Sequence, residues 1–584
     1  MKDRIIRNLK EHRSAIIVSL VIGLLVVLPT IIFIIQPGRG GFHGIYPVFN
    51  DDEVHYLAMT EEVYDGHASL GNTFIKELKD QPPIQSPAVF RALAMEARIL
   101  HLSVPTTFVI NDFLFPAIGL LLLYSLFHRI TKQKNLALIF ATSFYLLFLF
   151  SFGRPVNPQF SFIFFLIGLI LIWEIYEREG STLYLAALFG VLSGLTLYIY
   201  IYYFSALLAL FGISLLAKVI SKKRVRTFFL ECICFLIPAA LLSVPYGLNL
   251  LMTSASPFYQ ETMSRFGMLF NRWPACYINV SIALIGALII LISRKKISDQ
   301  KKIYFAFGLS LSSVILNWQN VATGAYLQLS SHYYPVTVLF FIIVLAIAGE
   351  PIYRSFRDRG AAGVTKSQVI FIIVLACMLL YRQQGEIRRG LSIAAGGDEV
   401  KQEDLKPLFD WLNANTQPDS VVYTLGDSAD PLIPVYTKNN LYSYGYAGYY
   451  LMSDREIEDR WARKNYFSGR IDEEYIRTNF RDIWLNKYLD QYQNNLIRAR
   501  LAAIFFPRIK MPELLPADAV SRVVEHYGQV KKESPREALK KYTIDYLVYD
   551  TADPDYVDFK SNVVGYNFLS QSGQIGQYRI YKVD

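Results

Sequence analysis

Cysteine is rare in this chain, which holds four cysteines among 584 residues. None is placed to form a disulfide in a soluble domain, because all four lie within or at the edge of long apolar segments: Cys232, Cys234, Cys276 and Cys377. The spacing and apolar surroundings of Cys232 and Cys234 do not suit a zinc site. Cysteine usage therefore gives no indication of the redox compartment.

Several signals of common function classes are also missing. The chain has no internal repeat, no low-complexity tract and no nucleotide-binding signature, because the Gly396-Gly397 pair lacks both the spacing and the preceding strand of such a motif. The net charge of +9 comes from basic residues in short loops next to apolar segments, where membrane insertion accounts for them. We therefore expect no nucleic-acid partner.

Long apolar segments are abundant instead. Hydrophobic residues make up 53% of the chain and the mean hydropathy is +0.28, which exceeds what a soluble core carries. A membrane helix needs about 20 mostly apolar residues. The first candidate span follows basic residues but is too long for a signal-peptide core and lacks a cleavage site, so we expect a retained anchor. About eleven spans are predicted, at 15–35, 106–127, 136–152, 160–175, 183–200, 201–220, 228–252, 276–292, 303–316, 335–348 and 368–381.

Lysine and arginine gather in alternate loops, which predicts the topology because these residues stay on the cytoplasmic side. The apolar run between Arg178 and Lys222 is too long for one crossing and is basic at both ends, so we expect it to cross twice. The N-terminus is then cytoplasmic and the C-terminus extracytoplasmic. The outward loops are 36–105, 153–159, 253–275 and 317–334.

The sequence changes character after Tyr381, where charged residues become frequent. One helix face is marked by Leu405, Leu408, Phe409 and Leu412, and strand patterns occur at 421–424, 544–549 and 578–583. We expect a polytopic α-helical membrane domain over 1–382, with a long first extracytoplasmic loop at 36–105, and a soluble extracytoplasmic α/β domain over 383–584.

The first outward loop carries three consecutive carboxylates at a predicted helix start, Asp51, Asp52 and Glu53. Asn50 can cap this helix, Glu53 can reach back as in a capping box, and Gly66 can end it. Acids in the first turn also stabilise a helix through its dipole, so a structural role accounts for them. Alternatively, an acid beside the outer leaflet could act as general base on a lipid-linked substrate, or hold a divalent cation that neutralises a phosphate.

Three arginines lie in outward loops, against the cytoplasmic bias of this residue type: Arg154, Arg265 and Arg272. A guanidinium group suits bidentate recognition of a phosphate. The alternative is that each arginine lies at a helix end and contacts lipid head groups in general.

A polar segment between Asn317 and Pro335 contains Gln328 and His332. Amides and a histidine at a membrane boundary are costly unless they pair with each other, with water or with a ligand. His332 could bind substrate, bind a metal or transfer a proton, although a lone histidine is more often structural. A run of tyrosines at 442, 444, 446, 449 and 450 could stack on sugar rings, but strand packing explains it as readily.

These features together resemble the GT-C superfamily of integral membrane glycosyltransferases. The resemblance is carried by Asn50-Asp51-Asp52-Glu53 in a long first outward loop, by Tyr56-Leu57-Ala58 and Gly66 after it, and by many spans with an outer α/β domain. It implies a polyprenyl-phosphate-linked sugar donor, an acceptor outside the cytoplasmic membrane, and Asp51 or Asp52 as the catalytic acid. Asp52 is favoured, because the second helical position can turn into a cavity. The resemblance does not establish a metal.

The sequence therefore predicts a glycosyltransferase of the cytoplasmic membrane, with a sugar moved to a glycan, lipid or protein acceptor. The candidate substrate-binding residues are Glu53, Arg154, Arg265, Arg272, Gln328 and His332. No cofactor is required, and a divalent cation is left open. A transporter is the rival class, although few acids lie mid-span where ion coupling would need them. A non-catalytic envelope assembly or binding protein is a further alternative.

Overall fold

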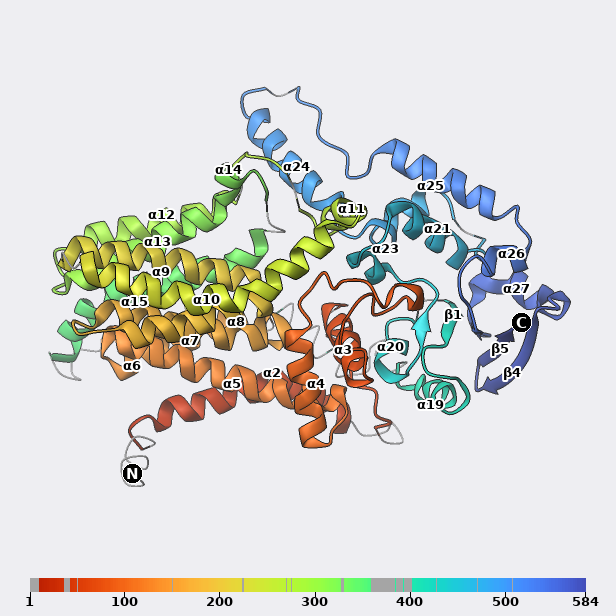
Figure 1. Ribbon diagram of the computed structural model, residues 1–584, viewed down its shortest axis with the longest axis horizontal. Helices are drawn as coiled ribbons and strands as arrows, with labels where there is room; N and C mark the ends of the chain where they lie inside the picture. The colour runs from red at the N-terminus through yellow and green to blue at the C-terminus, as the bar shows by residue number, and fades with distance from the viewer. Residues whose placement is uncertain are drawn as a thin grey trace.

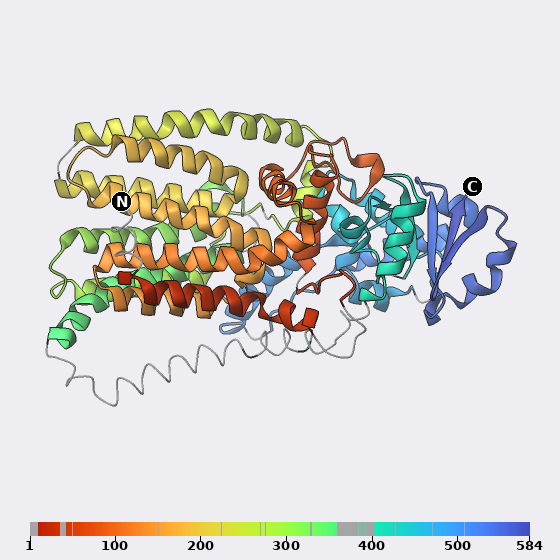
Figure 2. The same cartoon turned by 90° about the horizontal axis from the view of Figure 1, so that it is seen from below.

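The computed structural model describes residues 10–35, 42–49, 51–149, 151–222, 225–268, 270–274, 276–326, 330–358, 384, 392, 402–426, 428–469, 471–506 and 508–584. A bundle of long helices forms one end of the molecule and a mixed α/β part forms the other (Figure 1). The first outward loop lies between them. A view turned by 90° shows the same elongated, two-part arrangement (Figure 2).

The described part of the bundle has ten helices that correspond to predicted spans. They are α2 (Arg13–Ile35), α5 (Val104–Thr131), α6 (Lys134–Leu147), α7 (Ser161–Glu177), α8 (Leu183–Ile199), α9 (Ile201–Lys222), α10 (Val225–Ser254), α12 (Tyr277–Ser293), α13 (Gln300–Asn317) and α15 (Tyr334–Asp358). The eleventh predicted span, 368–381, lies outside the described residues. Within the described ranges six helices are long and apolar enough to cross a membrane, and three shorter apolar helices accompany them. The chain is a multi-pass membrane protein.

Local signals set the helix boundaries. The Ser103 hydroxyl caps α5 by accepting a hydrogen bond from the Thr106 amide at 3.4 Å. The same helix ends at Thr131, and the next residue, Lys132, is left-handed with a φ of 56°. Tyr200 has an extended backbone between α8 and α9, so the long apolar run divides into two helices, as predicted.

Ion pairs gather the predicted basic loops at one end of the bundle. Arg129 pairs with Glu174, Lys132 with Glu177 at 3.2 Å, Lys134 with Glu11 at 3.0 Å and Lys301 with Glu179 at 3.0 Å. These pairs join three loops to the start of the chain. The predicted alternation of loops is thus present in the fold, with the basic loops at the end away from the α/β part (Figure 1).

Short elements cover the opposite end of the bundle. The first loop forms α3 (Asp51–Tyr64), η1 (Lys76–Leu78) and α4 (Ala88–Leu100), and the other outward loops form η2 (Ser151–Gly153), η3 (Pro155–Phe160), α11 (Tyr259–Arg265), α14 (Gln319–Thr323) and η4 (Ser330–Tyr333). As predicted, the first helix stops before Gly66, whose φ of 117° few other residues tolerate. The predicted cap Asn50 lies outside the described residues.

The α/β part is built on a five-stranded sheet with the order β2-β1-β3-β5-β4. The strands are β1 (Val421–Leu425), β2 (Asn440–Leu441), β3 (Tyr546–Asp550), β4 (Leu569–Ile575) and β5 (Tyr578–Val583). β1 pairs in parallel with β2 and β3, and β5 is antiparallel to β3 and β4. The three predicted strands are confirmed. Two strands were not predicted: β2, which is two residues long, and β4, whose side chains are mostly polar.

The α/β part also contains a set of helices, most of them short. They are α19 (Lys406–Asn415), α20 (Ile433–Tyr436), η6 (Gly445–Tyr449), α21 (Asp454–Lys464), α22 (Glu473–Thr478), α23 (Arg481–Trp484), α24 (Leu489–Ala503), α25 (Ala517–Val530), α26 (Pro535–Leu539), η7 (Pro554–Tyr556), α27 (Val557–Asn562) and η8 (Val563–Gly565). The predicted helix face is confirmed in α19, where Leu408, Phe409 and Leu412 are buried.

The first loop shares one hydrophobic core with the α/β part. Leu57, Phe74 and Phe90 belong to the same cluster of buried side chains as the strands. A main-chain hydrogen bond also connects the two parts, because the Leu441 amide donates to the Phe74 carbonyl at 2.9 Å. The first loop therefore packs as part of the outer layer, although the sequence analysis grouped it with the bundle.

Candidate active site

A cavity of about 1240 Å³ lies where the bundle meets the outer layer. One wall comes from the bundle, at the turn between α8 and α9 and the end of α10 around Leu250. The opposite wall comes from η6 and α23 of the α/β part, and α3 contributes a third side. Three of the sequence-predicted site residues line this cavity together: Asp52, Arg154 and His332.

Asp52 and Arg154 form an ion pair inside this cavity. Arg154 Nη1 donates to Asp52 Oδ2 at 2.7 Å. The Arg154 side chain is 26% exposed and the Asp52 side chain is 44% exposed. Asp52 is in the first turn of α3, while Arg154 precedes η3, more than a hundred residues later. The pair thus places a carboxylate and a guanidinium side by side, both accessible to a bound molecule.

The Arg154 side chain is also held by its own loop. Its Nε donates to the Asn157 carbonyl, while Nη2 has no acceptor among the described residues. Burial lowers the pKa of Arg154, but the nearby Tyr56 hydroxyl and Asp52 carboxylate raise it, and the net shift is upward. The guanidinium is a fixed positive charge with donor capacity left for an anion.

His332 lies in η4, just before α15. Its ring stacks on Tyr202 with 4.4 Å between ring centroids and 16° between planes, and Nδ1 hydrogen-bonds the Tyr200 hydroxyl. Burial, with Arg154 nearby, lowers the pKa of His332 to about 4, against the opposite effect of Asp52. The imidazole is therefore neutral at physiological pH and can act in polar contacts without adding charge.

His55 is a cavity residue that the sequence analysis missed. It is 5% exposed, it stacks on Phe74 and contacts Tyr446, and its Nδ1 has no hydrogen-bond partner in the described part of the chain. Burial lowers the pKa of His55 to about 4, so this ring is also neutral. The available signal was its spacing, since three residues after Asp52 is the same face of α3.

The tyrosine run of the α/β part divides between packing and the cavity. Tyr442 and Tyr450 are buried in the core, and the Tyr450 hydroxyl bonds Thr73 at 2.7 Å. The other three tyrosines line the cavity: Tyr444, Tyr446 and Tyr449. Aromatic faces of this kind offer stacking surfaces to a flat or apolar ligand group.

Three predicted substrate contacts lie outside this cavity. Glu53 is buried and accepts a hydrogen bond from the Phe49 amide at 3.0 Å, so it reaches back across the helix start much as predicted. Arg265 is fully buried and binds the Gly448 and Met452 carbonyls at 2.7 and 2.6 Å. Arg272 is exposed and donates to main-chain carbonyls of the segment after α13 at 3.1 and 2.7 Å. All three serve contacts within the protein.

Two further predicted site residues lie wholly or partly outside the described structure. Gln328 lies outside the described residues, and for Asp51 only the backbone is described, as the first residue of α3. Within the described ranges no group of three or more His, Cys, Asp or Glu side chains could hold a metal ion. Within the described ranges Cys232, Cys234 and Cys276 form no disulfide, and Cys377 is outside these ranges.

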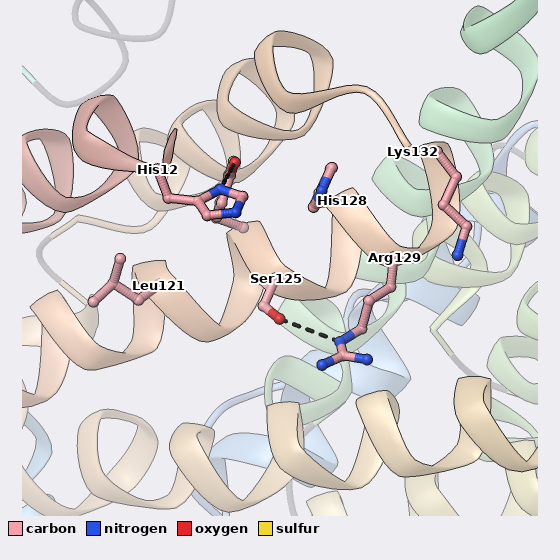
Figure 3. A pocket seen from close by; sticks show the side chains of 7 residues that line it. His12, Leu121, Ser125, His128, Arg129 and Lys132 are labelled. Atoms are coloured by element: carbon pink, nitrogen blue, oxygen red, sulfur yellow. Dashed lines mark hydrogen bonds between the residues drawn. The ribbon is translucent and has the colours of Figure 1, made fainter. Parts of the chain in front are cut away.

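A smaller cavity of about 460 Å³ lies at the basic end of the bundle, between α2 and α5 (Figure 3). It is lined by His12, Leu121, Tyr124, Ser125, His128, Arg129 and Lys132. Both of its permanent cations are paired with glutamates of α7, and no carboxylate lines it. The larger cavity is therefore the candidate active site, because it alone of the two combines an acid, a cation and aromatic walls.

Neither a protein-family model nor a curated protein sequence matches the chain. Two solved structures are similar to it. The cryo-EM structure of arabinofuranosyltransferase AftD from Mycobacteria is 15% identical with a TM-score of 0.46, and the match covers 98% of this chain but only 40% of that chain. The crystal structure of ArnT from Cupriavidus metallidurans in the apo state is 10% identical with a TM-score of 0.44, over 98% of each chain.

The first of these two structures is, by its printed name, that of an arabinofuranosyltransferase. At identities and TM-scores this low, the likeness decides neither the activity nor the substrates of this chain. Those must be argued from its own residues.

Proposed function

We propose that this chain is a membrane glycosyltransferase, which moves a sugar from a polyprenyl-phosphate carrier to an acceptor outside the cytoplasmic membrane. The observation that carries the proposal is the Asp52–Arg154 pair in a cavity between an apolar bundle and a polar outer layer. A lipid-linked donor needs such a boundary, because its chain must stay in the bilayer while its sugar and phosphate meet polar groups.

In the proposed reaction Asp52 is the general base. It takes the proton of the acceptor hydroxyl while that oxygen attacks the anomeric carbon from the face opposite the phosphate. The bond between the sugar and the phosphate oxygen breaks, the electron pair leaves with the phosphate, and the configuration inverts. Asp51 is the alternative base.

Arg154 holds the departing phosphate in this proposal. Its Nη2, which has no acceptor within the described ranges, and its fixed charge suit an oxyanion whose charge grows as the bond breaks. The two neutral imidazoles, His55 and His332, can hydrogen-bond the sugar or the phosphate without competing with Arg154 for the anion. The tyrosines of η6 can stack on the sugar ring.

The proposed orientation puts the N-terminus in the cytoplasm and the cavity outside. It is supported by the ion pairs that gather the basic loops at the far end of the bundle. Reporter fusions at Lys301 and near Gln417 test it, and a cytoplasmic signal at Gln417 contradicts it.

The chemistry is tested with purified protein, a panel of labelled polyprenyl-phosphate sugars and an extract of envelope acceptors. Asp52→Asn should lower transfer by about 10²–10⁴-fold, the usual contribution of a general base, while donor binding persists. Arg154→Met should weaken the binding of polyprenyl phosphate itself. Asp410→Asn is the matched control, because this carboxylate of α19 is exposed, paired with Lys406 and outside the cavity.

The same assay separates the rival classes. A transporter would move the labelled sugar without a covalent product, and a binding protein would retain the donor unchanged. Full transfer by both Asp52→Asn and Asp51→Asn would sink the assignment of the base.

A further inference from the structure

Helix α24 and the tip that follows it carry large apolar side chains that the described chain leaves about half exposed or more. Ile497 and Leu501 are one helical turn apart in α24, and Ile504, Phe505 and Phe506 follow the end of the helix at Ala503. The exposed fractions of Ile504, Phe505 and Phe506 are 70%, 77% and 66%. Side chains of the bundle that face outward have similar values, such as Leu241 of α10 at 69% and Ile278 of α12 at 72%.

The position of α24 explains why these exposed apolar side chains are tolerable. Figures 1 and 2 both show the helix extending from the α/β part back to the level of the bundle's outer end. The guanidinium of Arg498 lies over the ring of Trp273, 5.3 Å from its centroid. Trp273 is itself exposed and comes four residues before the start of α12. The middle of α24 is therefore held at the height where an apolar bundle helix begins.

The charged residues of this segment are all basic. Between Asn494 and Met511 there are four basic residues and no acidic residue: Arg498, Arg500, Arg508 and Lys510. Basic residues beside an apolar face with Phe and Trp are the composition of a helix that lies in a membrane interface. Anionic head groups suit such a segment through the field that they create.

We propose that the second half of α24 and the tip that follows it, residues 494–506 and 508–511, dip into the outer lipid surface of the bilayer that holds the bundle. The segment is a second, non-spanning anchor for the α/β part. It is continuous with the candidate active site, because α23 and Asn486 line the cavity and α24 begins three residues after Asn486. The anchor thus sets the height of that cavity wall above the bilayer.

The test uses the full-length protein in nanodiscs, with the four native cysteines replaced and a nitroxide label placed on Phe505→Cys. Collision of the label with oxygen, which concentrates in lipid, is compared with collision with a water-soluble nickel chelate. Ile278→Cys on α12 is the lipid-exposed reference. Val564→Cys, which is 95% exposed in the α/β part, is the reference for water.

The label at 505 should give a ratio of oxygen to nickel accessibility close to that at 278 and well above that at 564. The ratio should be higher in nanodiscs that contain phosphatidylglycerol than in those of phosphatidylcholine alone. A ratio at 505 equal to that at 564 in both compositions would overturn the proposal. So would shielding from both reagents with spin–spin broadening between labels, which would indicate a second copy of the chain as the occupant.

A pair of substitutions gives an independent readout. Phe505→Glu with Phe506→Glu, combined with a label at Ile497→Cys, should shift the ratio at 497 toward the value for water. A control pair on the opposite side of the α/β part, Asn562→Glu with Val564→Glu, should leave the ratio at 497 unchanged. An unchanged ratio in the Phe505/Phe506 variant contradicts the anchor even if the protein remains folded.

Discussion

Replacing Arg265 with methionine should destabilise the outer layer far more than it affects the binding of a phosphate. The guanidinium is fully buried and donates to the Gly448 and Met452 carbonyls at 2.7 and 2.6 Å, to Thr262 Oγ1 at 3.0 Å and to Asp454. It joins α11, an outward loop of the bundle, to the segment between η6 and α21.

The magnitude follows from the groups that the substitution leaves behind. Two buried carbonyls lose their donors, at about 1–3 kcal/mol each. The Asp454 carboxylate keeps Lys487 as a partner, so it is not left unpaired. We expect the free energy of unfolding of the outer layer to fall by about 4 kcal/mol, and its melting temperature by about 10 °C.

The assay is thermal unfolding of the purified protein followed by intrinsic fluorescence. Arg272→Met is the matched control, because this second arginine of the same outward segment is exposed, and its replacement should change the stability by about 0.5 kcal/mol or less. Binding of polyprenyl phosphate is measured alongside. An unchanged melting temperature for Arg265→Met, together with weakened phosphate binding, would refute this reasoning and return Arg265 to the substrate site.

Two further predictions concern stability. Burial raises the pKa of Asp490 to about 7, against the opposing effect of Arg481. The folded state therefore keeps a proton on this carboxyl that the unfolded state releases near about pH 4. The free energy of unfolding should then fall as pH rises from about 4 through about 7. Melting curves across this range should show the fall in the native protein and a smaller one in Asp490→Asn, and equal slopes would contradict it. A Cβ at Gly23 would lie 2.4 Å from the Phe113 carbonyl, whereas Gly212 has open space, so Gly23→Leu should lower the melting temperature in detergent and Gly212→Leu should not. Equal effects would mean that α2 and α5 are not closely packed.

The segments with a strong local pattern were predictable from the sequence. Ten predicted spans coincide with helices because a long apolar run can satisfy its backbone only as a helix in lipid. The division at Tyr200 and the stop before Gly66 also follow from local signals. β4 was missed because its Gln571, Ser572 and Gln574 side chains lack an apolar alternation, and its pairing with β5 is made through the main chain.

The residue types that form the candidate site were predictable from the sequence, but the individual residues that come together there were not. Its acid followed from the helix start, and outward arginines were expected to complement it. The sequence predicts the same role for Arg154, Arg265 and Arg272, because each is the same residue type in a similar loop. His55 was not predicted, because its spacing of three residues from Asp52 was the only signal for it in the sequence.

The sequence by itself thus determined the bundle, the alternation of its loops and the acidic helix start, because hydropathy and capping act over a few residues. Only the tertiary structure decided that Arg154 pairs with Asp52, that the buried Arg265 hydrogen-bonds groups of the outer layer, and that the first loop packs in the α/β core. These outcomes depend on how segments a hundred or more residues apart pack together. The physical reason is that a charged side chain pairs with whichever group the fold brings within hydrogen-bond distance, and a local sequence pattern does not predict which distant group that is.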